Sequence, residues 1–186
     1  MMPTYSTQLT PRQFAYVAGL GLYRLRSAEA AGRKPRGGIR QTDVGTRYAA
    51  DIEGMMGEFV VAKLLGFCTT PESFKPVVNA LDREGDLPYG IQIKTTVYTP
   101  GHLIIDPGAD KNHYYVLVSG KYGSYTIQGY GKAGDLMTPA ALKRGKEKSP
   151  AHRKEDAAYW VKAEDLLGMD GLIEYVKQQN ALAESA

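Results

Sequence analysis

The sequence predicts an α/β protein in which a central mixed β-sheet is flanked by helices. Three observations lead to this prediction: two stretches of helical periodicity come first, several β-rich runs follow, and a short strand and a helix close the chain. The length of 186 residues is typical of one domain, and the 43% of hydrophobic residues suffice for a core.

Two helices are expected in the first third of the chain. Thr10-Pro11 has the form of an N-cap followed by a proline at the first helical position, and apolar residues then recur at helical spacing to about Ala31. The segment GRKPRGGIRQ has no apolar period and is typical of a loop or a disordered arm. A second helix is expected from about Asp43 to Leu65, ending at Gly66.

The middle of the chain changes to strand patterns. The run IQIKTTVY places Ile91 and Ile93 on one face and Gln92 and Lys94 on the other. HLIID is typical of a short strand, and HYYVLVSG is typical of a buried central strand. YGSYTIQGYG predicts another strand after the turn at 120–123. All of these strands are expected in one central sheet.

The last part is expected to hold a basic loop at 142–154, a short strand and helical turn in YWVKAEDLLG, and a final helix. Asp170 is expected to cap that helix, which runs to about Leu182.

The net charge of +3 conceals an uneven distribution. Residues 24–47 hold seven Lys and Arg against two acids, 142–154 hold six against one, and the remainder of the chain is acidic. Clustered basic residues favour a polyanionic partner, although a solvated surface is the plain alternative. The expected nucleic-acid contacts are Arg33, Lys34, Arg36, Arg40, Arg47, Lys143, Arg144, Lys146 and Lys148.

Composition excludes several classes of protein. The single cysteine, Cys68, excludes an internal disulfide framework and a cysteine-rich zinc site, and the three histidines match no zinc-ligand spacing. No apolar run approaches the roughly 20 residues of a membrane helix, and the first residues lack the apolar stretch of a secretory signal. A cytoplasmic location is expected, in the host cytoplasm if the protein is phage-encoded.

Glu58 is the first residue that indicates chemistry. It lies in GMMGEFVVAKLLG, among apolar residues at helical spacing, and a carboxylate there is costly unless it is paired, hydrogen-bonded or metal-bound. Gly54 and Gly57 lower helix propensity, which makes sense if another element packs close to the backbone. A salt-bridged structural glutamate is the alternative.

Asp86 and the strand IQIK complete the pattern. Asp86 ends the acidic cluster LDREGD just before a short turn, and Gln92 and Lys94 share one face of the strand. Phosphodiester hydrolysis needs Mg²⁺ on oxygen ligands, which lowers the pKa of a bound water, and a cation near the developing charge. Asp82 and Glu84 remain alternatives to Asp86 as the metal-binding acid.

The order of these residues resembles the PD-(D/E)XK nuclease superfamily, in which a helix glutamate, an aspartate and a residue–x–lysine tripeptide on a strand follow one another. The matching pieces are GMMGE with Glu58, REGD with Asp86, and IQIK with Gln92 and Lys94. HYYVLV, YTIQGYG, GDLM and YWVKAEDL are similar to segments of small phage and prokaryotic members, so the resemblance covers about 43–167. Gly85 stands in place of the proline, and Gln92 stands where an acid is commonest.

The resemblance implies a restriction-endonuclease-like core and a Mg²⁺-dependent deoxyribonuclease, with Mn²⁺ as a substitute. Asp86, Gln92 and Glu58 are then the metal ligands, and Lys94 serves the attacking water. Residues 1–42 form the N-terminal helix and basic arm, and 43–186 form the nuclease-like core of a single domain. DNA is the expected partner and RNA stays open, whereas a membrane is not expected. A homodimer is an option because cutting two strands needs two active sites.

Two alternatives to an active nuclease stay open. Gln92 favours a protein that keeps the fold and binds nucleic acid or a partner without catalysis. In a structural or interaction protein, Asp86, Gln92 and Lys94 would be surface polar residues. No helix-turn-helix signal is evident, so a structure-selective or weakly sequence-specific endonuclease is expected over a site-specific one.

Overall fold

The computed structural model describes residues 5–30, 32, 44–67, 85–144 and 157–185. The helices in these residues are α1 (Pro11–Ala30), α2 (Val44–Leu64), α3 (Ala133–Leu136) and α4 (Asp170–Glu184), with a 3₁₀ turn at Ala163–Asp165. The strands are β1 (Tyr5–Gln8), β2 (Ile91–Thr96), β3 (His102–Ile105), β4 (Tyr114–Lys121), β5 (Ser124–Lys132), β6 (Leu142–Arg144) and β7 (Ala157–Lys162). The predicted α/β class is confirmed.

The strands form two sheets where one was predicted. A four-stranded sheet has the order β1-β5-β4-β2, and it is mixed because β2 runs parallel to β4 while the other pairs are antiparallel. A smaller antiparallel sheet has the order β3-β7-β6. The prediction of a single sheet is wrong because β3 pairs with the distant β7, with Leu103 opposite Val161. Alternation within a strand does not specify its partner.

The two long helices were predicted nearly to the residue. At the start of α1 the Thr10 hydroxyl accepts a hydrogen bond from the Gln13 amide N–H (3.2 Å), and the Gln13 side chain accepts one from the Thr10 N–H (3.0 Å). The chain leaves α2 through Gly66, whose φ is +76°. None of the described helices has the length and apolar character needed to cross a membrane.

Three details of the sequence prediction are wrong or missing. The α4 N-cap is Met169, and no side chain caps this helix, so Asp170 belongs to the first turn. Its carboxylate instead accepts a hydrogen bond from the Tyr5 hydroxyl (2.8 Å). The short strands β1 and β6 were not predicted, and β6 begins the segment that was predicted as a basic loop.

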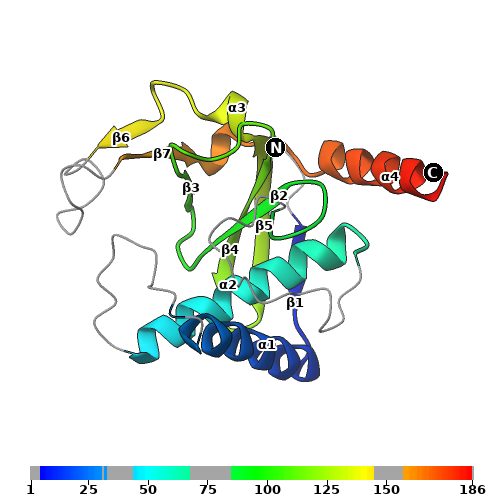
Figure 1. The fold of residues 1–186 in the computed structure, drawn as a ribbon. Helices are drawn as coiled ribbons and strands as arrows, with labels where there is room; N and C mark the ends of the chain where they lie inside the picture. The colour runs from blue at the N-terminus through cyan, green and yellow to red at the C-terminus, as the bar shows by residue number, and fades with distance from the viewer. Residues whose placement is uncertain (1–4, 31, 33–43, 68–84, 145–156, 186) are drawn as a thin grey trace.

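The two hydrophobic cores meet at the four-stranded sheet. Helices α1 and α2 lie side by side against one face of this sheet (Figure 1). The core on that side contains Val17, Met56, Phe59, Ile91, Ile93, Val116 and Val118. A second core between the two sheets contains Leu103, Ile105, Tyr115, Leu117 and Val161. Strand β4 contributes to both, which confirms the prediction of a buried central strand.

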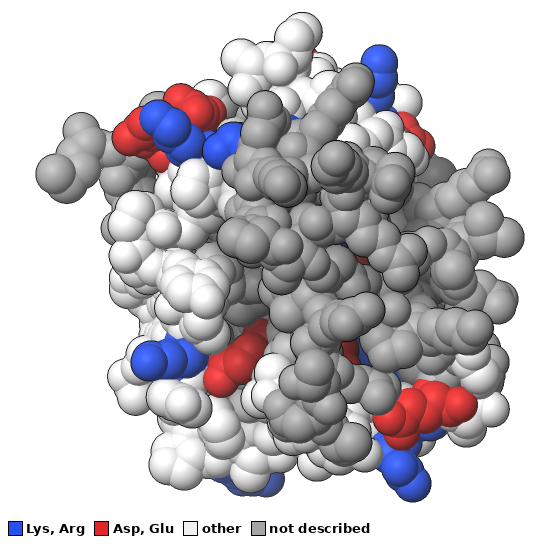
Figure 2. Space-filling model, turned by 90° about the vertical axis from the view of Figure 1, so that its left-hand side faces the viewer, with Lys and Arg blue, Asp and Glu red and all other residues white. Residues whose placement is uncertain are grey.

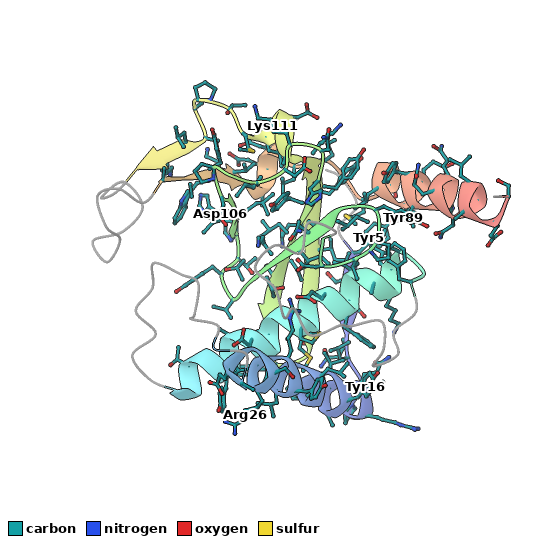
Figure 3. The ribbon with its side chains drawn as sticks, viewed as in Figure 1. Tyr5, Tyr16, Arg26, Tyr89, Asp106 and Lys111 are labelled. Atoms are coloured by element: carbon teal, nitrogen blue, oxygen red, sulfur yellow. The ribbon has the colours of Figure 1, made fainter. Side chains whose placement is uncertain are left out.

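Two tyrosines attach α4 to the rest of the fold. Tyr5 donates to Asp170, and the Tyr89 hydroxyl donates to the Asn180 side chain at 2.6 Å. Figure 3 shows both tyrosines on the side of the sheet where α4 lies. Tyr89 belongs to the turn that precedes β2, so α4 supports the turn that leads into the strand IQIKTT.

Helix α2 packs tightly on β2 because Gly57 has no side chain. A Cβ atom built on Gly57 would lie 1.9 Å from Thr95 Oγ1, 3.1 Å from Thr95 Cβ and 3.2 Å from Thr95 Cγ2. Rotation of the threonine cannot relieve this overlap, since all three atoms crowd the position. A Cβ atom built on Gly54 would meet no atom of another described element within 4 Å. The close packing expected around both glycines therefore holds for Gly57 only.

We expect Gly57→Ala to lower the free energy of unfolding by about 1–3 kcal/mol, because overpacking forces backbone and side chains to shift. Gly54→Ala is the matched control on the same helix and should be neutral or stabilising by up to about 1 kcal/mol. Urea denaturation measures both. Equal effects of the two substitutions would show that the α2–β2 contact is not tight.

Candidate functional site

Glu58 is the only charged residue classed as buried in the described part of the chain, with 8% of its surface exposed. It lies on α2 between core residues, among them Met55, Val61 and Ala62. Its predicted position on an apolar helix face is therefore confirmed. A carboxylate at such a position requires a partner.

The partner is Arg24 of α1, which the sequence analysis placed only in a basic segment. Arg24 Nη1 donates to both carboxylate oxygens of Glu58, each at 2.7 Å. The Arg24 side chain is only 24% exposed. A sequence signal was present: Arg24 lies two helical turns after the core residue Val17 and next to the core residue Leu25, on the apolar stripe of α1.

Asp86 lies on the other side of the same guanidinium. Its Oδ1 is 3.8 Å from Arg24 Nη2, and its Oδ2 accepts a hydrogen bond from the Ile93 backbone N–H (2.8 Å). Strand β2 is bonded to β4 along one side, so this hydrogen bond places Asp86 at the other edge of β2. Asp86 thus follows the edge of the strand IQIKTT.

The backbone before β2 explains why Gly85 precedes Asp86. Leu87 and Ile91 form an antiparallel bridge around a tight turn. Gly85 has a φ of +95°, and a Cβ there would lie 2.8 Å from the Ile91 carbonyl oxygen and 2.9 Å from its nitrogen. Proline has a φ near −65°, so the proline of the family pattern does not fit this turn.

Lys94 and Gln92 lie on the face of β2 opposite to Ile91 and Ile93, as predicted. Lys94 Nζ is 5.9 Å from the centre of the Tyr115 ring, and Gln92 is in register with Tyr115. Within the described part of the chain, no hydrogen bond or ion pair joins Gln92 or Lys94 to the two carboxylates. Lys94 is nevertheless near enough for its charge to lower the pKa of Glu58.

The pKa of Glu58 is raised to about 7, chiefly because burial removes the carboxylate from water and also because of the negative charge of Asp86. The charges of Arg24 and Lys94 lower it, and the hydrogen bond from Arg24 does so too. The removal of the carboxylate from water thus outweighs its attraction to two cations. Glu58 is a titratable group poised near neutral pH.

The carboxylates meet the first requirement of a divalent-cation site. Both oxygens of Glu58 and the Oδ1 of Asp86 face one cationic group, the Arg24 guanidinium, so both carboxylates border a position that holds positive charge. Carboxylate oxygens are the ligands that Mg²⁺ prefers, and Mg²⁺ keeps several waters when two carboxylates bind it. In the described residues, no three His, Cys, Asp or Glu side chains form a cluster.

Of the other metal candidates, Gln92 lies in the described residues, where its side chain makes no hydrogen bond with Glu58 or Asp86. Asp82 and Glu84 lie outside the described residues.

Most of the predicted nucleic-acid contacts also lie outside the described residues: Arg33, Lys34, Arg36, Arg40, Lys146 and Lys148. Arg47 lies in the first turn of α2 and Arg144 is the last residue of β6, but their side chains are not described. Lys143 is described, and its Nζ lies 5.5 Å from the centre of the Trp160 ring. On the side shown in Figure 2, most described Lys and Arg side chains lie beside Asp and Glu, without a uniformly basic surface among them.

Comparison of the chain with protein-family models, with curated proteins and with solved structures finds no match. The candidate site therefore stands on its own geometry and on the order of its residues.

The raised pKa of Glu58 predicts a pH dependence of stability. Between about pH 4.5 and 7, the Glu58 carboxyl keeps its proton in the folded state and releases it in the unfolded chain. The contribution of Glu58 to the free energy of unfolding is therefore complete below this pH window and is lost as pH rises through it. Between pH 5 and 8 the free energy of unfolding should fall by about 2 kcal/mol from this group. Glu58→Gln removes this contribution. Its free energy of unfolding, compared with that of the wild type, should therefore be higher at pH 8 than at pH 5.

Urea denaturation in EDTA at both pH values measures this difference. Glu164→Gln is the control, because that carboxylate is exposed and pairs with Lys162 at the surface. The same pH slope in the wild type and in Glu58→Gln would contradict the raised pKa.

Proposed function

We propose that this protein is a Mg²⁺-dependent DNA endonuclease with a restriction-endonuclease-like core. One observation carries the proposal: the helix carboxylate Glu58 and the turn carboxylate Asp86 face one cation at the edge of a strand that carries Lys94. These are the parts that metal-assisted phosphodiester hydrolysis requires.

Each residue has a role in this proposal. Glu58 and Asp86 bind the cation, which polarises the phosphate and lowers the pKa of a bound water. The hydrogen bond from the Ile93 N–H holds Asp86 Oδ2, so that Oδ1 is the oxygen turned toward the site. Lys94 orients the attacking water or stabilises the charge that develops on the phosphate. Gln92 supplies an amide oxygen in place of a third carboxylate.

The described ends that flank the two basic segments support DNA as the substrate. The ends of α1 and α2 that flank the first segment lie on the left in Figure 1, and the ends of β6 and β7 that flank the second lie on the same side. Clustered basic residues in sequence between such ends suit contact with the backbone of a duplex. Structure-selective or weakly sequence-specific cleavage remains the proposed mode, and RNA and a homodimer stay open.

A second candidate function has its own observation. Arg24 already neutralises Glu58 and lies near Asp86, so the two carboxylates have a cationic partner without a metal ion. Together with Gln92 this favours a protein that binds nucleic acid on the same fold without cutting it. The cleavage assay below separates the two functions.

The purified protein should cut supercoiled plasmid in Mg²⁺ or Mn²⁺ and not in EDTA. Lys94→Ala and Asp86→Asn should each lower the rate by about 100-fold or more, since each removes a group that acts on the reacting atoms. Agarose gels with plasmid, linear duplex and branched DNA follow the products.

Lys111→Ala and Asp135→Asn are matched controls, because both side chains are exposed and lie outside the site. They should cut at the wild-type rate. DNA retention without cleavage in any metal would support the binding protein. The absence of both retention and cleavage would overturn both functions.

Salt should weaken DNA binding steeply if the two basic segments contact the backbone. Neutralisation of about six to ten phosphates lowers the affinity by about 10³–10⁵-fold between 50 and 200 mM salt. Fluorescence anisotropy with a labelled duplex in EDTA measures the slope. Substitution of Lys146 and Lys148 by Ala should reduce it, whereas a slope near zero would exclude the segments as backbone contacts.

A further inference from the structure

Arg24 occupies the space between the two carboxylates that the proposed function gives to a metal ion. Its Nη1 donates hydrogen bonds to both oxygens of Glu58, and its Nη2 faces Asp86 Oδ1. The remaining oxygen, Asp86 Oδ2, is held by the Ile93 N–H. Both Glu58 oxygens and Asp86 Oδ1 therefore already face the guanidinium.

A guanidinium and a hydrated divalent cation compete for the lone pairs of these oxygens that face the space between the two carboxylates. Each Glu58 oxygen lies 2.7 Å from Nη1, a distance that leaves no room for another ion between them. Metal–oxygen bonds of Mg²⁺ are about 2.1 Å long and replace hydrogen bonds to the same lone pairs. Binding of the metal ion thus requires Arg24 to leave at least Glu58.

The burial of Glu58 explains why Arg24 is needed at this position. Glu58 is buried, and a buried carboxylate without a cation is unstable. Arg24 supplies the positive charge from the neighbouring helix when no metal ion is bound. Its side chain is long and partly exposed, so it can turn outward without unfolding α1.

We propose that Arg24 is a built-in competitor of the divalent cation, which pairs with Glu58 in the metal-free protein and is displaced when the cation binds. This inference rests on the metal site of the proposed function. It adds a positioning residue from α1, outside the stretch that carries the family resemblance. The displaced guanidinium remains next to the site, where it is available to a phosphate of the substrate.

Removal of Arg24 should strengthen metal binding. Calorimetric titration of the full chain with Mn²⁺ at pH 8.5 should give about tenfold or greater affinity for Arg24→Gln over the wild type. Arg24→Lys keeps a cation and should lie between them. Arg26→Gln is the control on the same helix, because Arg26 is 73% exposed, pairs with Glu29 and lies on the outer side of α1 in Figure 3. The Mn²⁺ affinity of this variant should equal that of the wild type.

The outcomes separate this inference from the proposed function. Mn²⁺ binding that Asp86→Asn abolishes, with equal or weaker binding in Arg24→Gln, would overturn the competition and keep the metal site. No Mn²⁺ binding by the wild type or by Arg24→Gln would overturn both.

A second measurement observes Arg24 in the wild-type protein itself. In the wild-type protein, the Nε–Hε signal of Arg24 in a ¹⁵N spectrum should be protected without metal and should move to the position of a solvent-exposed arginine on addition of Mg²⁺. Arg24→Lys assigns the signal. An Arg24 signal that stays unchanged while Mg²⁺ binds would overturn the displacement.

Discussion

The ion pair between Arg24 and Glu58 is the interaction on which the candidate site depends. A buried carboxylate is tolerated only when a cation compensates for its lost hydration, and Arg24 from α1 provides this compensation at 2.7 Å. The pair joins α1 to α2 over the edge of β2. It also explains how Glu58 persists on an otherwise apolar helix face.

The same constraint gives α1 a role in the site. The sequence suggested an N-terminal helix with a basic arm in front of the nuclease-like core of a single domain, and in the structure Val17 and Leu25 are buried and Arg24 reaches the two carboxylates. The predicted boundary at residues 42 and 43 lies outside the described residues. In the proposed nuclease, α1 borders the metal site because its Arg24 supplies the charge that balances Glu58 when no metal ion is bound.

Local patterns predicted most of the elements, and the tertiary contacts explain what they missed. The period of apolar residues predicted α1 and α2, and alternation predicted which faces of β2 carry Ile93 and Lys94. The division into two sheets could not be predicted, because β3 pairs with a strand more than 50 residues later. Within the site, the burial of Glu58 was predicted from its apolar neighbours. Its pairing with Arg24 was not, because net charge along residues 24–47 does not distinguish an arginine on the apolar stripe of α1 from the basic residues that follow it in sequence.

The account turns on whether the carboxylates of Glu58 and Asp86 hold a divalent cation. A crystal of the protein soaked in Mn²⁺ and measured at the manganese absorption edge tests this most directly. The account predicts an anomalous peak between the two carboxylates, with the Arg24 guanidinium turned away from Glu58. An intact Arg24–Glu58 ion pair with no peak beside Asp86 at saturating Mn²⁺ would contradict it.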